Sequence, residues 1–238
     1  MQGLAALRWF FIVRFARPAL TRRSCQTLGV MNTLDQQLLA ASEDLSSRLL
    51  AVLAVPVYDD SQRIRVSRLA ASVALDHSSA CRTLLAVGMV PSSLVVHRAQ
   101  YEASVRAVWA LYAATEAQVA KLAATLAIEA EQEAKNLPQV AEMLSALATR
   151  APASAYQALA NFKENSWGAL NSFVHAGMHP LQRQESGYPV QLAEQVLRNC
   201  NGLAVIAGMQ AAVLTGNQQL VKQVGTLQTT YAQCLPLQ

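Results

Sequence analysis

The residues best placed to do chemistry form a row on one predicted helix, near residues 93–114. Arg98, Glu102 and Arg106 follow one another at four-residue intervals, so their side chains share one helix face. A carboxylate between two guanidinium groups stays ionised and fixed in direction. Since only 14% of the residues are charged, this row predicts a polar site. The alternative is an exposed stripe of ion pairs, each of which adds little stability.

A second polar group ends a later predicted helix and holds two of the four histidines. Asn171 and His175 are one helical turn apart, and an imidazole near neutral pH can act as a general acid or base. The alternative is a histidine that merely benefits from the negative end of a helix. We expect both groups to form one candidate catalytic pocket, made of Arg98, Glu102, Arg106, Asn171 and His175.

Neither a metal nor a cofactor is predicted. Two histidines four residues apart, His175 and His179, bind a metal only with a third ligand, and nothing in the spacing brings Glu102 to them. Cys81 follows His77 by one turn, but a buried cysteine mostly packs as a small apolar residue. The chain has no H-E-x-x-H, no Walker A loop, no G-x-G-x-x-G and no G-x-S-x-G, the motifs that signal zinc, phosphate, dinucleotide and serine-hydrolase chemistry.

The two polar groups carry a resemblance. The pattern Arg98-x-x-x-Glu102-x-x-x-Arg106, followed by Asn171-Ser172-Phe173-Val174-His175-Ala176-Gly177, resembles uncharacterised bacterial all-α proteins that are distantly similar to HEPN and abortive-infection-like helical bundles. The resemblance covers mainly residues 31–238 and implies a helical fold with the same pocket. HEPN ribonucleases carry an arginine four to six residues before their histidine, and no arginine stands there before His175 or His179.

The elements that must position these residues are all predicted to be helices. The 238-residue chain is 53% apolar, which excludes a disordered protein. Its four cysteines form no C-x-x-C, which excludes a zinc ribbon and a disulfide framework. From Leu34 onward apolar residues recur with the helical period, and no alternating strand pattern interrupts them. We therefore expect an all-α fold, a single up-and-down bundle of six to eight helices.

Prolines, glycines and capping residues divide the predicted bundle. Ser92 or Ser93 is expected to cap the helix that carries Arg98, and His175–Pro189, with two glycines and two prolines, is expected to be a loop. The dense apolar stretch Gly202–Leu214 has 13 residues, fewer than the about 20 that span a bilayer, and predicts a central buried helix. The other expected helices lie near residues 34–55, 62–87, 115–135, 139–149, 156–174, 190–214 and 217–234.

Residues 1–30 differ in kind from the rest of the chain. They contain five arginines and no acidic residue, whereas residues 31–238 contain 14 basic and 15 acidic residues. We expect a basic, aromatic N-terminal segment outside the domain, either a leader or sequence upstream of the true start at Met31. An interfacial membrane helix is the alternative. The domain itself is expected at residues 31–238.

The near-neutral charge of residues 31–238 argues against a nucleic-acid or anionic-membrane surface. Without a complete catalytic motif, we expect a cytoplasmic bundle that self-associates as a homo-oligomer or binds a protein partner, in bacterial stress response or phage defence. The alternative is a HEPN-like, metal-independent ribonuclease that uses His175 with Arg98 or Arg106. Whether the chain is an enzyme is left open.

Overall fold

Side-chain caps fix the residues at which the first two described helices begin. At α2 (Gln36–Val52), the Asp35 carboxylate accepts a hydrogen bond from an amide of the first turn at 2.8 Å. At α3 (Gln62–Ala86), the Ser61 hydroxyl accepts one in the same way. Such caps satisfy amide groups that have no partner within the helix, so the chain enters both helices at defined positions.

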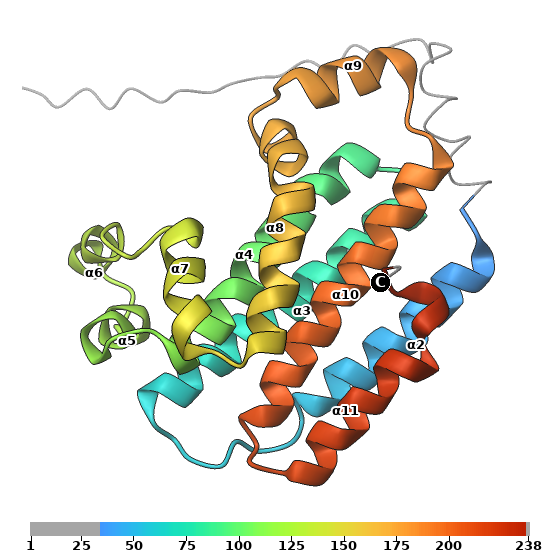
Figure 1. Ribbon diagram of the computed structural model, residues 1–238. Coiled ribbons are helices and arrows are strands. Elements are labelled where there is room, and N and C mark those ends of the chain that lie inside the picture. The colour runs from blue at the N-terminus through green and yellow to red at the C-terminus, as the bar shows by residue number, and fades with distance from the viewer. Residues whose placement is uncertain (1–33, 237–238) are drawn as a thin grey trace, which may run out of the picture.

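The computed structural model describes residues 34–236, and every regular element in that range is a helix (Figure 1). Ten of these elements are α-helices, and a short 3-10 helix, η1 (Ala232–Cys234), is the last element of the described range. After α2 and α3 come α4 (Val90–Tyr112), α5 (Glu116–Ala123), α6 (Ile128–Ala134), α7 (Val140–Arg150), α8 (Ala153–Val174), α9 (Met178–Ser186), α10 (Val190–Val213) and α11 (Gln218–Thr230). The all-α expectation is confirmed.

Helix α10 lies at the centre of the bundle and packs against α2, α3, α4 and α11 (Figure 1). Small residues let its neighbours approach closely: Ala207 and Ala211 are fully buried. At Gly208 the approach of α2 is closest, because an added Cβ there would lie 2.5 Å from Leu49 Cδ2. The expectation of a central buried helix at Gly202–Leu214 is therefore confirmed.

Polar side chains of α10 bond to the helices around it. The Asn201 amide donates to Ser42 Oγ on α2 at 2.8 Å, and the Gln210 amide donates to Ser67 Oγ on α3 at 2.9 Å. Both amides are buried. Since a buried polar group left without a partner is costly, these bonds favour one register of α10 against its neighbours.

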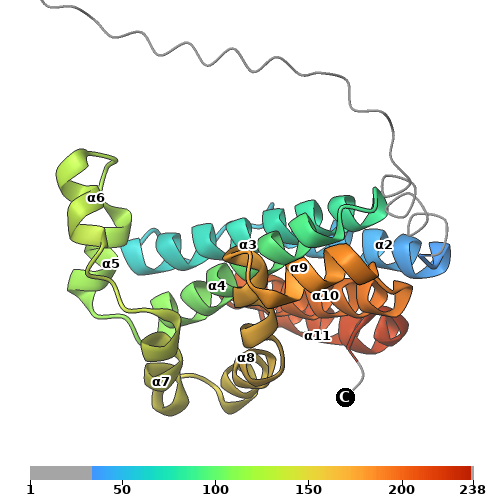
Figure 2. The same ribbon diagram turned by 90° about the horizontal axis from the view of Figure 1, so that it is seen from above.

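Helices α7 and α8 form a smaller layer on the side of α4. Figure 2 shows them together on one side of the bundle, with α3 on the opposite side. Between them and α4 lies a second apolar cluster, which includes the fully buried Tyr101, Leu147 and Leu159. This layer helps to position the predicted charged row, because Arg98 of the row contacts Trp167 of α8.

The helices differ from expectation in several places. The expected helix at residues 115–135 is two helices, α5 and α6. The bundle has ten α-helices within residues 34–236 rather than six to eight. The expected loop His175–Pro189 contains α9. Helix α4 begins before Pro91 rather than at Ser92 or Ser93, because a proline lacks an amide donor and is well tolerated in the first helical turn, where that donor would have no partner.

The expectations for residues 1–30 and for a start at Met31 lie outside the described residues. Within residues 34–236, none of the helices combines the length and the apolar character that crossing a bilayer requires.

Candidate functional site

The predicted charged row of α4 meets α8 at an arginine–tryptophan contact. Arg98 forms an ion pair with Glu102, with 3.0 Å between Nη2 and Oε1. Its guanidinium carbon lies 4.4 Å from the centre of a Trp167 ring. A guanidinium over an indole face is attracted by the electron-rich ring. Glu102 and Trp167 therefore hold Arg98 from two sides.

Arg106, the third member of the row, does not share the carboxylate. Among the ion pairs of residues 34–236, Glu102 pairs with Arg98 only. The Glu102 side chain is 35% exposed, so the carboxylate is only partly withdrawn from solvent. The Nε atoms of Arg98 and Arg106 are buried and make no hydrogen bond within the described part of the chain, which leaves both as free donors.

Helix α8 carries Asn171 and His175 away from this contact. His175 caps the C-terminal end of α8 and is exposed, and Asn171 is half-buried. His175 follows Trp167 by eight residues, about 12 Å along the helix axis. No hydrogen bond or ion pair in the described range joins either residue to Glu102, so their place in one pocket with it stays a prediction.

The contact is supported by buried aromatic rings between α4 and α8. Tyr101 stacks on Phe162 with 4.7 Å between ring centroids, and it meets Trp167 edge-on at 5.9 Å. The Tyr101 hydroxyl donates to the Leu159 carbonyl at 2.9 Å. Burial raises the pKa of Tyr101, so the hydroxyl keeps its proton at neutral pH and remains a donor. These ring contacts fix the position of Trp167.

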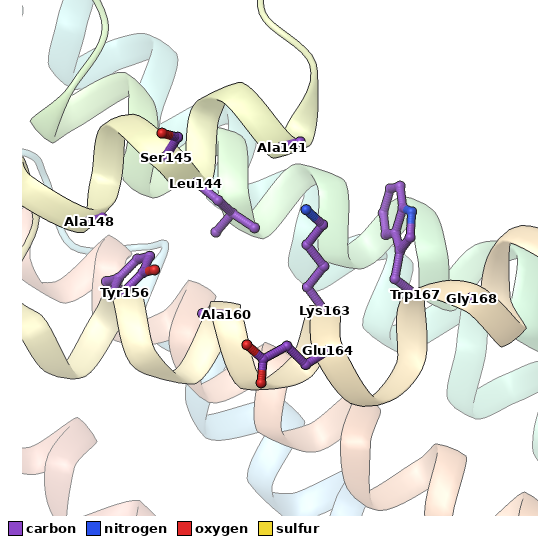
Figure 3. A pocket seen from close by; sticks show the side chains of 10 residues that line it. All are labelled: Ala141, Leu144, Ser145, Ala148, Tyr156, Ala160, Lys163, Glu164, Trp167 and Gly168. Carbon is purple, nitrogen blue, oxygen red and sulfur yellow. The ribbon is translucent and has the colours of Figure 1, made fainter.

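An open groove runs between α7 and α8 beside Trp167, with a volume of about 550 Å³ (Figure 3). Figure 3 shows that Lys163 and Trp167 extend from α8 toward α7, while Glu164 lies along α8. Four of the ten lining residues are alanine or glycine, which have small side chains. The lining residues are Ala141, Leu144, Ser145 and Ala148 of α7, and Tyr156, Ala160, Lys163, Glu164, Trp167 and Gly168 of α8.

Sequence reasoning missed this groove. The only signal is the spacing of small residues, such as Ala141, Ser145 and Ala148 at i, i+4 and i+7 on α7. The same spacing occurs on helix faces that are covered in the core, so the pattern cannot show that this face is open. The groove offers one ammonium, one carboxylate and two aromatic rings.

Fold and site together define the class: an all-α bundle with an open groove on its α7–α8 layer. The chain belongs to the family of unknown function DUF6988, which matches residues 71–237. The match includes α4, α7 and α8. No curated protein and no solved structure matches the chain. Similarity to HEPN or abortive-infection proteins is not shown by these comparisons.

Proposed function

We propose that this chain is a self-associating protein whose α7–α8 groove pairs with the same groove of a second copy. One observation carries the proposal: Lys163 and Glu164, of opposite charge, are adjacent near the middle of the α8 wall of the open groove. Neither takes part in an ion pair among residues 34–236. A surface that pairs with itself brings unlike charges together across its twofold axis.

An antiparallel pairing of two α8 helices satisfies both charges. The α8 wall extends from Tyr156 to Gly168, about 18 Å along the axis. A twofold axis beside the charged pair places Lys163 of one copy opposite Glu164 of the second copy, and the reverse. Two ion pairs then form in each dimer. The small Ala160 and Gly168 let the second α8 approach the backbone.

The groove also contains the residue types that dominate binding energy at interfaces. Tyr156 and Trp167 are half-buried near its two ends, and tyrosine and tryptophan are enriched among interface residues that cost most when truncated. Arg98 already holds Trp167 in place. A preorganised side chain loses less entropy on binding, so Trp167 is the expected anchor.

The size of the groove sets the strength of the expected dimer. Ten residues line it in each copy, whereas stable interfaces have about 20–30 residues a side. We therefore expect a dimer with a Kd of roughly 10–50 μM, about −6 to −7 kcal/mol, populated only at high protein concentration.

Sedimentation velocity of the full chain, from about 1 μM to about 200 μM, brackets such a Kd. The wild type is expected to shift from monomer to dimer across this range. Lys163→Glu or Glu164→Lys places like charges opposite each other and should weaken the dimer about tenfold, ~1.4 kcal/mol. The double variant Lys163→Glu/Glu164→Lys restores unlike charges and should restore the dimer.

Lys222→Glu is the matched control, because Lys222 is exposed on α11 and removed from the groove. It should dimerise like the wild type. A wild type that stays monomeric over the whole range contradicts the proposal. A double variant that dimerises no better than the two single variants also contradicts it. In that case the dimer does not depend on pairing Lys163 with Glu164 of the second copy.

The alternative function, a HEPN-like ribonuclease, has one supporting observation: the unpartnered Nε donors of Arg98 and Arg106 could bind a phosphate. It also requires the exposed His175 at the end of α8 to reach that phosphate. Incubation of the full chain with single-stranded RNA tests it. Cleavage by the wild type but not by His175→Ala would place this activity ahead of self-association.

A further inference from the structure

Three potential metal ligands meet in the core where α3, α4 and α10 pack together. Cys81, His97 and Cys200, one from each helix, are 0%, 1% and 0% exposed. The two sulfur atoms and one imidazole nitrogen lie within 4.8 Å of one another. The sequence spacing places Cys81 one turn after His77 on the same helix. In the fold, Cys81 lies beside His97 of α4 instead.

A chain of hydrogen bonds decides which nitrogen of His97 carries the proton. The Gln100 amide nitrogen donates to the Cys200 carbonyl at 2.9 Å. A backbone carbonyl can only accept, so the other end of the Gln100 amide is its oxygen. That oxygen lies 3.0 Å from His97 Nδ1, and since it can only accept as well, Nδ1 must donate.

The remaining nitrogen, Nε2, is therefore a lone-pair acceptor in the neutral ring. It is buried and has no hydrogen-bond partner within the described residues. A buried acceptor without a donor is unfavourable. A metal ion can bind to such a nitrogen. Metal-bound histidines commonly donate their other ring N–H to an oxygen acceptor, as His97 Nδ1–H does to the Gln100 amide oxygen.

We propose that Cys81, His97 and Cys200 bind a zinc ion, with Gln100 as the residue that positions His97. Thiolate and imidazole are the ligands that zinc prefers. On binding, both thiols lose their protons to solvent, and two thiolates balance the charge of Zn²⁺. The neutral product suits a site without water, whereas a monovalent copper ion with two thiolates would leave a net buried charge.

The ligand positions need only a small adjustment. Zinc–sulfur bonds of about 2.3 Å in a tetrahedral site hold two sulfurs about 3.8 Å apart, so the two sulfur atoms, which lie within 4.8 Å of each other, close by at most about 1 Å. The hydroxyl of Ser78, whose Oγ is 3.3 Å from Cys200 Sγ, is the polar group available as the fourth ligand of a tetrahedral ion. Because the ligands are sealed from solvent, the ion must enter while the chain folds.

Metal content of the full chain, refolded with one equivalent of Zn²⁺ or Co²⁺ under reducing conditions, tests the proposal. The wild type should retain about one ion per chain through gel filtration. The Co²⁺ form should show the near-ultraviolet charge-transfer absorption of cobalt–thiolate bonds. Cys200→Ala should lose both signals, and Gln100→Ala should weaken binding roughly 10- to 100-fold.

Cys234→Ala is the matched control, because Cys234 is equally buried but lies outside the group. It should keep the ion and the absorption band. A wild type that refolds by circular dichroism yet retains no ion contradicts the proposal, as does a Cys200→Ala protein that binds Co²⁺ as the wild type does. The wild-type measurement decides the matter even if Cys200→Ala fails to fold.

Discussion

The polar side chains on the two sides of α4 differ in burial and in charge. Toward α3 and α10, Gln100 and Ser104 are fully buried, and each is bonded to a defined partner. Toward α8, Arg98 and Glu102 keep part of their surface in solvent and bond to each other. The buried side contains uncharged groups in a connected network, whereas the α8 side contains full charges in a pair.

Desolvation explains this division. An uncharged amide or hydroxyl can enter the core if its hydrogen bonds are replaced, but an ion needs far more compensation. The charged row is therefore the conspicuous feature of the sequence and the weaker one in energy. Gln100, which no sequence pattern singles out, connects α4 to α10 through its bond to the Cys200 carbonyl, and we expect it to contribute more to stability.

The largest expected effect comes from breaking the buried network. Gln100→Ala removes a fully buried side chain and leaves the His97 Nδ1–H without its acceptor. We expect a loss of about 3 kcal/mol in the free energy of unfolding, from the cavity and the unsatisfied group together. Urea denaturation of metal-free protein measures it.

Gln132→Ala on the exposed α6 is the control and should change stability by less than about 0.5 kcal/mol. Equal effects of the two substitutions would mean that the network around Gln100 adds nothing beyond an exposed side chain.

The second prediction compares a glycine in the core with one in the groove. A Cβ at Gly208 would meet Leu49 at 2.5 Å, whereas a Cβ at Gly168 has no atom within 4 Å. We expect Gly208→Ala to destabilise by about 1–3 kcal/mol, because Leu49 must move. Gly168→Ala should stabilise by up to about 1 kcal/mol through helix propensity. Thermal unfolding at low protein concentration measures both, and a loss of stability in Gly168→Ala would show that the α8 face is covered.

A smaller effect is expected from breaking the exposed charged pair. Glu102→Gln removes the charge partner of Arg98 but keeps the side-chain shape. With Glu102 35% exposed, solvent screening should limit the loss to under about 1 kcal/mol. A loss as large as that of Gln100→Ala, measured by the same urea denaturation, would overturn the distinction between the two sides of α4.

The smallest expected effect concerns Glu102 and His175. Because no bond joins them in the described range and His175 lies at the exposed end of α8, Glu102→Gln and His175→Ala should be additive in stability. A double-mutant cycle should give a coupling within about 0.3–0.5 kcal/mol of zero. A larger coupling would restore the single polar pocket that the sequence predicts.

Local patterns in the sequence were sufficient for most of the helices. The apolar period from Leu34 onward and the dense apolar stretch Gly202–Leu214 predict the all-α class and the central place of α10. Each of these signals acts within a few turns of one helix, which is why it can be read without the fold. The spacing of Arg98 and Glu102 likewise predicts their ion pair, because i, i+4 neighbours meet on any helix.

Only the tertiary structure decided which faces of those helices meet and which stay open. Trp167 reaches Arg98, and Cys81 reaches His97 and Cys200, across separations of 16 residues or more in the sequence. The open α7–α8 groove has the same small-residue pattern as a covered face. Such contacts depend on crossing angles and register summed over several helices, set by the volumes of buried side chains. The order of residue types along one helix does not specify these crossing angles or this register.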